Sequence, residues 1–182
     1  MSQTSALKDP AITNLDAVPV VPPTTGEGGP GYQKSTNNFV TALSADAVGS
    51  TYRICRFKTS AKVKTVKLWS AIASAGAGDI DVAYSDAPLS GNFDGTPPAL
   101  AGTVVQVSSA DNKLFGVAST LVAQSGVDVT FAGSYTQANS NQPMWAVLGL
   151  TQDPGGYFDI LIKVTTAVTT GGVVAVRVDF VE

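Results

Sequence analysis

The stretch "YFDILIKVTTAVTTGGVVAVRVDFVE" (residues 157–182) contains two runs in which every second residue is apolar. A period of two is typical of β-strands that bury only one face. The segment 167–172 between the runs ends in two glycines, which predicts a hairpin loop that joins two paired strands. The apolar positions are Phe158, Ile160, Ile162 and Val164 in the first run, and Val174, Val176, Val178 and Phe180 in the second.

Shorter strand-like runs occur earlier in the chain, between turn signals. Residues 50–59 and 62–73 are separated by only two residues, and this spacing predicts a second hairpin. In residues 79–85, Asp79 and Asp81 alternate with apolar positions, so we expect these two carboxylates on the solvent face of a strand. Two further predicted strands span residues 103–109 and 126–133.

Two segments predict short helices. Residues 110–124 begin with Asp111 as a candidate N-cap, and residues 141–150 place Pro143 at the first helical position. No long amphipathic helix is predicted that would cover a sheet, so one apolar sheet face must pack against another. The expected fold class is therefore all-β: a β-sandwich of the jelly-roll type with one or two short helices.

Residues 1–36 cannot build a core, and we expect them to form an extended N-terminal arm ahead of a β-sandwich domain at 37–182. Eight of the thirteen residues from Pro19 to Gly31 are Pro or Gly. Because proline lowers the entropy lost on ordering, the segment suits docking on a surface, although a solvated tail remains the alternative. The candidate contact residues of the arm are Leu15, Val18, Val20, Val21 and Tyr32.

The composition excludes several function classes. The chain has no histidine, which excludes Ser-His-Asp and Cys-His catalysis and histidine-ligated zinc. Its single cysteine, Cys55, excludes an internal disulfide. The N-terminus has no signal-like region and no apolar stretch approaches the roughly 20 residues of a membrane span, so we expect synthesis in the cytoplasm and no membrane partner.

The carboxylates do not form a recognisable site. Asp79, Asp81, Asp86 and Asp94 lack the loop spacing of a calcium site, and no pair of acids is singled out for glycoside hydrolysis. We therefore expect a protein that is not an enzyme and has no cofactor or metal.

Two tryptophans leave carbohydrate binding open as an alternative. Trp145 lies in an apolar helical turn and is more simply a core residue, whereas Trp69 fits either a core or a sugar-stacking role.

Basic residues are concentrated in one part of the chain. Six of the eleven lie within residues 53–67, although the net charge of the whole chain is −3. Nucleic-acid binding, a solvated strand pair and a docking patch for an acidic protein surface are the three interpretations. We favour the docking patch and expect no nucleic-acid partner. The six residues are Arg53, Arg56, Lys58, Lys62, Lys64 and Lys67.

Two long segments carry a resemblance. "GSTYRICRFKTSAKVKTVKLWSAIASAGAGDIDVAYSD" (49–86) resembles a family of tailed-bacteriophage virion proteins, often encoded near the major capsid protein. That family has a Gly-Ser-x-Tyr-Arg opening, basic strands, a small-residue turn and then Asp-Ile-x-Val-x-Tyr. "QPMWAVLGLTQDPGGYFDILIKVTTAVTTGGVVAVRVDFVE" (142–182) continues the match with a Pro-x-Trp-x-x-Leu-Gly-Leu turn, an Asp-Pro turn and a closing hairpin. The match is weakest over 87–110.

The resemblance implies a non-enzymatic structural protein of the virion, and in particular a capsid decoration or cement protein on the outer capsid surface. Its partners would be the major capsid protein and further copies of itself, with a trimer suggested by analogy to other cement proteins. A head–tail connector, a tail component and a carbohydrate-binding module for host attachment remain the alternatives. The family has no catalytic residues to carry over.

Overall fold

The structure, a computed structural model, describes residues 7–8, 33–84 and 113–182. The five candidate contact residues of the arm and the predicted strand at 103–109 lie outside these ranges. So do Asp86, Asp94 and Asp111.

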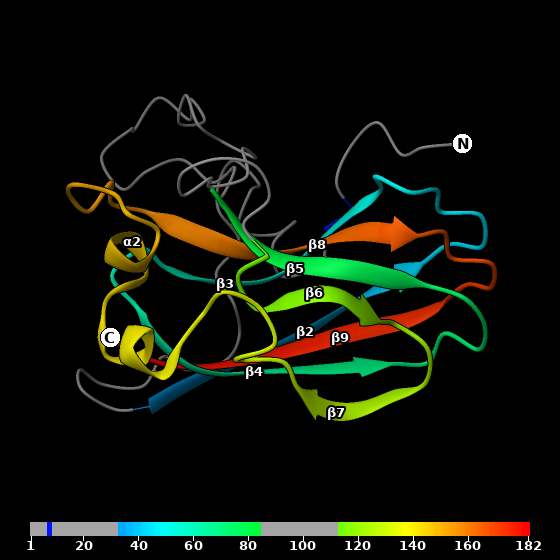
Figure 1. The fold of residues 1–182 in the computed structure, drawn as a ribbon, viewed down its shortest axis with the longest axis horizontal. Coiled ribbons are helices and arrows are strands. Elements are labelled where there is room, and N and C mark those ends of the chain that lie inside the picture. The colour runs from blue at the N-terminus through cyan, green and yellow to red at the C-terminus, as the bar shows by residue number, and fades with distance from the viewer. Residues whose placement is uncertain (1–6, 9–32, 85–112) are drawn as a thin grey trace, which may run out of the picture.

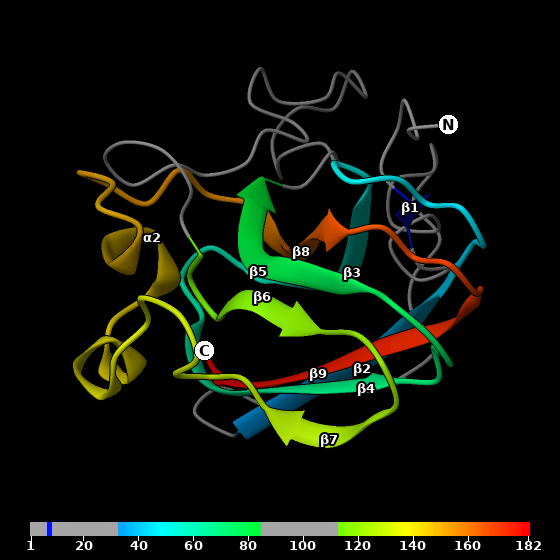
Figure 2. The same cartoon turned by 45° about the vertical axis from the view of Figure 1, so that its right-hand side comes forward.

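The regular secondary structure of the described chain is almost entirely β-strand, arranged in two layers (Figures 1 and 2). One sheet has the order β1-β3-β8-β5-β6 and the other has the order β2-β9-β4-β7. A 3-10 helix η1 (Gln137–Asn141) and a short helix α2 (Met144–Val147) lie between β7 and β8. The strands are β1 (Leu7–Lys8), β2 (Gln33–Ala42), β3 (Thr51–Lys58), β4 (Lys62–Ser70), β5 (Ala77–Tyr84), β6 (Gly116–Thr120), β7 (Gln124–Asp128), β8 (Tyr157–Thr166) and β9 (Gly172–Val181).

The strand order is that of a jelly roll. Apart from the two-residue β1, which pairs with β3 in parallel, all pairings are antiparallel. The pairs β2–β9, β3–β8, β4–β7 and β5–β6 nest inside one another, as in one long hairpin that has been rolled up. Because the roll brings β4 beside β9 and β5 beside β8, it closes a five-stranded and a four-stranded sheet over a common core. The predicted all-β sandwich is confirmed.

Both predicted hairpins are wrong. β3 and β4 belong to different sheets, and so do β8 and β9, although only a few residues separate the members of each pair. Each short connection crosses from one layer to the other, so that the apolar faces of consecutive strands meet across the core. Alternation identifies the face that a strand buries, but it does not identify the hydrogen-bonding neighbour.

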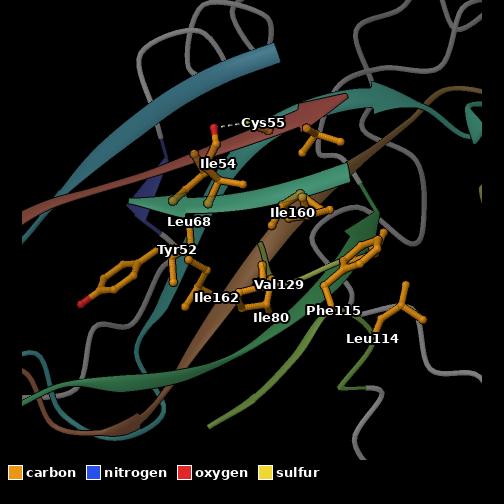
Figure 3. Packing of buried hydrophobic residues seen from close by; sticks show 14 of the residues in the cluster. Tyr52, Ile54, Cys55, Leu68, Ile80, Leu114, Phe115, Val129, Ile160 and Ile162 are labelled. Carbon is orange, nitrogen blue, oxygen red and sulfur yellow. Dashed lines mark hydrogen bonds between the residues drawn. The ribbon is translucent and has the colours of Figure 1, made fainter. Parts of the chain in front are cut away.

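The core lies between the two sheets (Figure 3). Ile54, Ile80 and Ile160 from the larger sheet are fully buried, and Leu68 of β4 is almost so. Val176, in the middle of β9, is also fully buried. These positions are the apolar members of the alternating runs, which explains why the pattern in the sequence indicates the buried faces correctly.

Two buried tyrosines bring polar groups into this core. The hydroxyl of Tyr52 donates to Asp46 Oδ2 at 2.8 Å, and the hydroxyl of Tyr135 donates to the carbonyl of Val63 at 2.7 Å. Burial raises the pKa of Tyr52, and its hydrogen bond to Asp46 and the charge of that carboxylate raise it further. Burial alone raises the pKa of Tyr135. Both hydroxyls therefore stay protonated and act as hydrogen-bond donors.

The solvent-facing role predicted for Asp79 and Asp81 is wrong, because both residues are buried. Asp81 Oδ1 accepts the backbone N–H of Leu114 at 2.9 Å, and Asp79 Oδ1 accepts that of Ala118 at 2.7 Å. These carboxylates hold the segment that contains β6 against β5. The helix predicted at 110–124 is also wrong, because the described part of this segment forms β6 and the start of β7.

The other two predicted segments differ from the structure mainly in length. The strand predicted at 126–133 ends at Asp128, where β7 ends. The helix predicted at 141–150 is only four residues long, and Pro143 is its N-cap rather than its first residue. The predicted boundary at residue 37 lies inside a strand, since β2 begins at Gln33.

Two valines on β9 test this assignment of faces. Val176→Ala removes two methyl groups from a fully buried position, so we expect it to lower the free energy of unfolding by about 2 kcal/mol. Val173→Ala removes the same groups from an exposed position of the same strand and should cost less than about 0.5 kcal/mol. Urea unfolding followed by circular dichroism measures both, and equal losses would contradict the assignment.

Candidate interaction surface

The six predicted basic residues do not form one surface, because Arg53 and Arg56 are buried. Both guanidinium groups form ion pairs with Asp159 of the neighbouring strand β8. Arg56 Nε lies 2.7 Å from Asp159 Oδ1, and Arg56 Nη2 lies 3.0 Å from Asp159 Oδ2. These two arginines therefore stabilise the sheet and are not part of an exposed patch.

A β-bulge brings the two arginines to the same carboxylate. Residues three apart in a regular strand point to opposite faces, so Arg53 and Arg56 would normally be separated. The ladder between β3 and β8 shifts register between Ile54 and Arg56, and the intervening Cys55 has a φ of 52°. The extra residue returns Arg56 to the face of Arg53. Cys55 itself is buried and its Sγ donates to the carbonyl of Val176 at 3.0 Å.

The four lysines lie in different places. Lys58 is exposed and its Nζ lies 3.3 Å from Glu182 Oε2. Lys64 donates to the carbonyl of Ser140 at 2.7 Å, which connects β4 to η1. Lys62 and Lys67 are on the outer face of the four-stranded sheet, in register with outward positions of β9. A docking role remains a prediction for the exposed lysines.

The outer face of the four-stranded sheet carries apolar residues in register. Phe39 of β2 pairs with Ala175 of β9, and Ala175 pairs on its other side with Trp69 of β4. Phe39 is 50% exposed, and Trp69 is half-buried. The three side chains therefore form one row across the sheet, on the side opposite the core.

A glycine gives the Trp69 indole its position. An added Cβ at Gly126 of β7 would lie 3.0 Å from three atoms of the indole, and Gly126 has a φ of +70°. The absence of a side chain at this position thus lets the indole lie directly against the backbone of β7.

Further exposed apolar residues lie toward the end of the sheet where β2 leads into the loop 43–50, beyond the exposed Thr41, which pairs with Val173. Leu43 and Val173 are exposed, and a Cβ at Gly171 would lie 3.7 Å from the backbone of Leu43. Leu43 is held in place, because its backbone N–H donates to Asp46 Oδ2 at 2.9 Å. We call the whole set the apolar stripe: Phe39, Leu43, Trp69, Val173 and Ala175.

Charged residues occupy the next row of the same face. Arg177 and Lys67 are neighbours on the two central strands, and Asp128 follows on the edge strand β7. The Asp128 carboxylate accepts both the backbone N–H and the hydroxyl of Thr130, at 2.9 and 2.6 Å. Arg177 Nε lies 2.9 Å from Asp179 Oδ1, yet its side chain remains 47% exposed. The row therefore places charges of both signs beside the apolar stripe, because Asp128 is exposed next to Lys67 and Asp179 is paired with Arg177.

The sequence offered little signal for this surface. Strand β2 was not predicted, because the positions that face inward in its first half are Lys34, Thr36 and Asn38 rather than apolar residues. The outward positions Val173 and Ala175 did carry a signal, since a sheet face in contact with solvent is normally polar.

The described residues contain no group of three or more Cys, Asp or Glu side chains placed to hold a metal ion. Within the same part of the chain, no helix is long and apolar enough to cross a membrane.

No protein-family model matches the sequence, and no curated protein matches it. Among solved structures, the chain is similar to a chain of the "Cyanophage Pam1 capsid asymmetric unit". The two are 17% identical, the TM-score is 0.37, and the match covers 90% of this chain and 94% of that chain.

The buried ion pairs generate a stability prediction. Asp159→Ala leaves two buried guanidinium groups without this carboxylate, so we expect a loss of about 3–5 kcal/mol in the free energy of unfolding. Lys58→Ala removes one partner of an exposed ion pair and should cost less than about 1 kcal/mol. Chemical unfolding of both variants provides the measurement, and a loss below 1 kcal/mol for Asp159→Ala would contradict the structural role.

Proposed function

We propose that this protein is a non-enzymatic structural component of a phage virion that decorates the outer surface of the capsid and stabilises the shell. The observation that carries the proposal is the apolar stripe, an exposed apolar row on a rigid sheet face. Contiguous exposed apolar surface of this kind is typical of protein–protein contact sites. The resemblance of the sequence to tailed-phage virion proteins supplies the identity of the partner, the major capsid protein.

The resembling segments coincide with the centre of the fold. Residues 49–86 include β3, β4 and β5, and residues 142–182 include α2, β8 and β9. Strands β3, β8 and β5 are consecutive neighbours in one sheet, and β9 and β4 are neighbours in the other. The resemblance therefore involves the strands that hold the sandwich together, which supports a shared architecture.

A decoration protein acts through contacts that are repeated over a lattice. Each copy bridges neighbouring shell subunits, so a modest contact area per copy gives a large total effect on the shell. We propose that the protein does so as a homo-oligomer, with a trimer as the simplest state by analogy to other cement proteins.

The proposed arm also takes part in this bridging. Leu7–Lys8 pair with β3 and β2 begins at Gln33, so the 24 residues 9–32 start and end on the body. Because the segment has to return, its reach is at most about 40 Å, half of its extended length. That distance is enough to contact an adjacent subunit through Leu15, Val18, Val20, Val21 or Tyr32.

One observation favours a second candidate function. Trp69 is a half-buried indole on the outer face of its sheet, which also suits stacking on a sugar ring in a carbohydrate-binding module. A head–tail connector or tail component has no such specific observation in its favour.

Removal of residues 1–32 tests the role of the arm without cutting into β2. We expect the truncated chain to keep its β-sheet circular dichroism but to bind shells at least tenfold more weakly than the full chain, because bridging contacts are lost. Co-sedimentation with capsid shells assembled without this protein measures the affinity. Unchanged binding would refute the bridging arm, whereas failure of the full chain to bind would refute decoration itself.

A further inference from the structure

We propose that strand β2 pairs with the same strand of a second copy, antiparallel and edge to edge, so that two four-stranded sheets join into one. The inference rests on the backbone of β2 and on the side chains that its open edge presents. It goes beyond the proposed function, which names a homo-oligomer but no contact between copies. A contact of this kind has a twofold axis, so it predicts a dimer in place of the trimer suggested by analogy.

The first argument is the length and regularity of this edge. All ten residues of β2 pair with β9 without a shift in register, and β9 is the only described strand beside it. The edge strands β6 and β7 have five residues each, and their ladders contain register shifts. The remaining edge strand, β1, has two residues. Short and bulged edges discourage pairing with another chain, so β2 is the described edge best suited to strand addition.

The second argument identifies the backbone groups at the open edge. In an antiparallel ladder, the N–H and C=O of one residue point to the same side of its strand, and this side alternates along the chain. Cys55 Sγ lies 3.7 Å from the carbonyl oxygen of Thr36 and 3.0 Å from that of Val176. One sulfur atom can reach both oxygens only if both carbonyls point into the space between β2 and β9. Thr36 and every second residue from it therefore bond to β9. The alternate residues, whose N–H and C=O point to the open edge, are Gln33, Ser35, Asn37, Phe39 and Thr41.

The third argument is that these five residues complement themselves. A twofold axis at Asn37 places this residue opposite Asn37 of the second copy. The same axis places Ser35 opposite Phe39, and Gln33 opposite Thr41. Each of the five then meets a residue whose N–H and C=O also point to the shared edge, as hydrogen-bonded pairs of an antiparallel ladder require. A second copy therefore supplies all the donors and acceptors that this edge needs.

The fourth argument is charge, which also selects the occupant. The five edge residues are exposed and uncharged. Lys34, the only charged residue of β2, lies on the opposite face, and its Nζ is 2.6 Å from Glu182 Oε2. Arg177, the neighbour of Asn37 on β9, is ion-paired with Asp179. Edges that avoid pairing often carry exposed lysine, and its absence here favours a second copy over a partner of either charge.

This pairing keeps the outer faces of both copies on the same side of the joined sheet. Directly opposite residues of an antiparallel pair point to the same face, so Phe39 of each copy lies beside Ser35 of the other. The two apolar stripes then face in one direction. A dimer would present both stripes to one shell, which would increase its avidity for the shell. This consequence rests on the proposed function, whereas the pairing itself does not.

The first test is sedimentation velocity of the full chain with a single charge introduced at Asn37. We expect the unchanged chain to sediment as a dimer. Asn37→Lys and Asn37→Glu each place two like charges opposite one another across the axis, so each should raise the dissociation constant of the dimer at least tenfold. An equimolar mixture of the two variants should restore the dimer, because opposite charges then meet.

Ser125→Lys provides the matched control. Ser125 is an exposed residue on the outer face of β7, which is the other edge of the same sheet. The variant therefore adds the same charge at an edge that is short and bulged, and its dimer should dissociate within twofold of the unchanged chain. Thermal unfolding of all three variants, followed by circular dichroism, confirms that the fold is retained.

The outcomes separate this inference from the proposed function. A monomeric unchanged chain, or a trimer that Asn37→Lys leaves intact, would overturn the inference while decoration stands. Dissociation of both single variants without recovery in the mixture would also overturn it, since the twofold register would then be wrong. A dimer that responds as expected but does not bind shells assembled without this protein would support the pairing and refute decoration.

Discussion

The fold depends on one constraint: each sheet has an apolar face, and within the described residues the face of the other sheet is the large apolar surface that covers it. The inward faces of β3, β4, β8 and β9 all serve this contact, and their apolar residues are almost completely excluded from water. The same constraint explains why β3 and β4, and likewise β8 and β9, lie in different layers although each pair is consecutive in the chain. When a short connection passes from one layer to the other, the two strands that it joins can turn their apolar faces toward each other.

The two outer faces of the sandwich differ in character. On the larger sheet, Arg53, Arg56 and Asp159 form a buried ionic cluster that a single bulge at Cys55 makes possible. On the smaller sheet, the outward positions include Phe39, Trp69 and Val173 and stay in contact with solvent to a large extent. The outer face of the larger sheet thus contains buried charged residues, and the outer face of the smaller sheet contains exposed apolar residues. Charged residues are usually exposed and apolar residues are usually buried, so both faces depart from the common pattern. The ion pairs of the larger sheet join two strands of this chain, whereas the exposed apolar residues of the smaller sheet form the surface that we propose contacts the capsid.

The sequence indicated the buried faces well and the pairing of strands poorly. Period-two alternation reports which side of a strand is apolar, and the core positions of β8 and β9 were predicted on that basis. Sheet membership depends on contacts between distant segments, such as β2 with β9, that no local pattern contains.

Asp79 and Asp81 were misassigned because a carboxylate that accepts hydrogen bonds from backbone N–H groups looks the same in sequence as one that faces water. The candidate docking face was missed because β2 lacks a local strand signal, while two residues of the basic run were assigned to an exposed patch although they are buried.

The central claim is that this protein covers a capsid surface in many copies. The most direct measurement is its copy number per major capsid subunit in purified particles, determined by quantitative mass spectrometry. The account predicts a ratio near one, or a simple fraction that repeats over the lattice. A few copies to a dozen per particle would contradict decoration and indicate a connector or tail position, and absence from the particle would contradict a virion role.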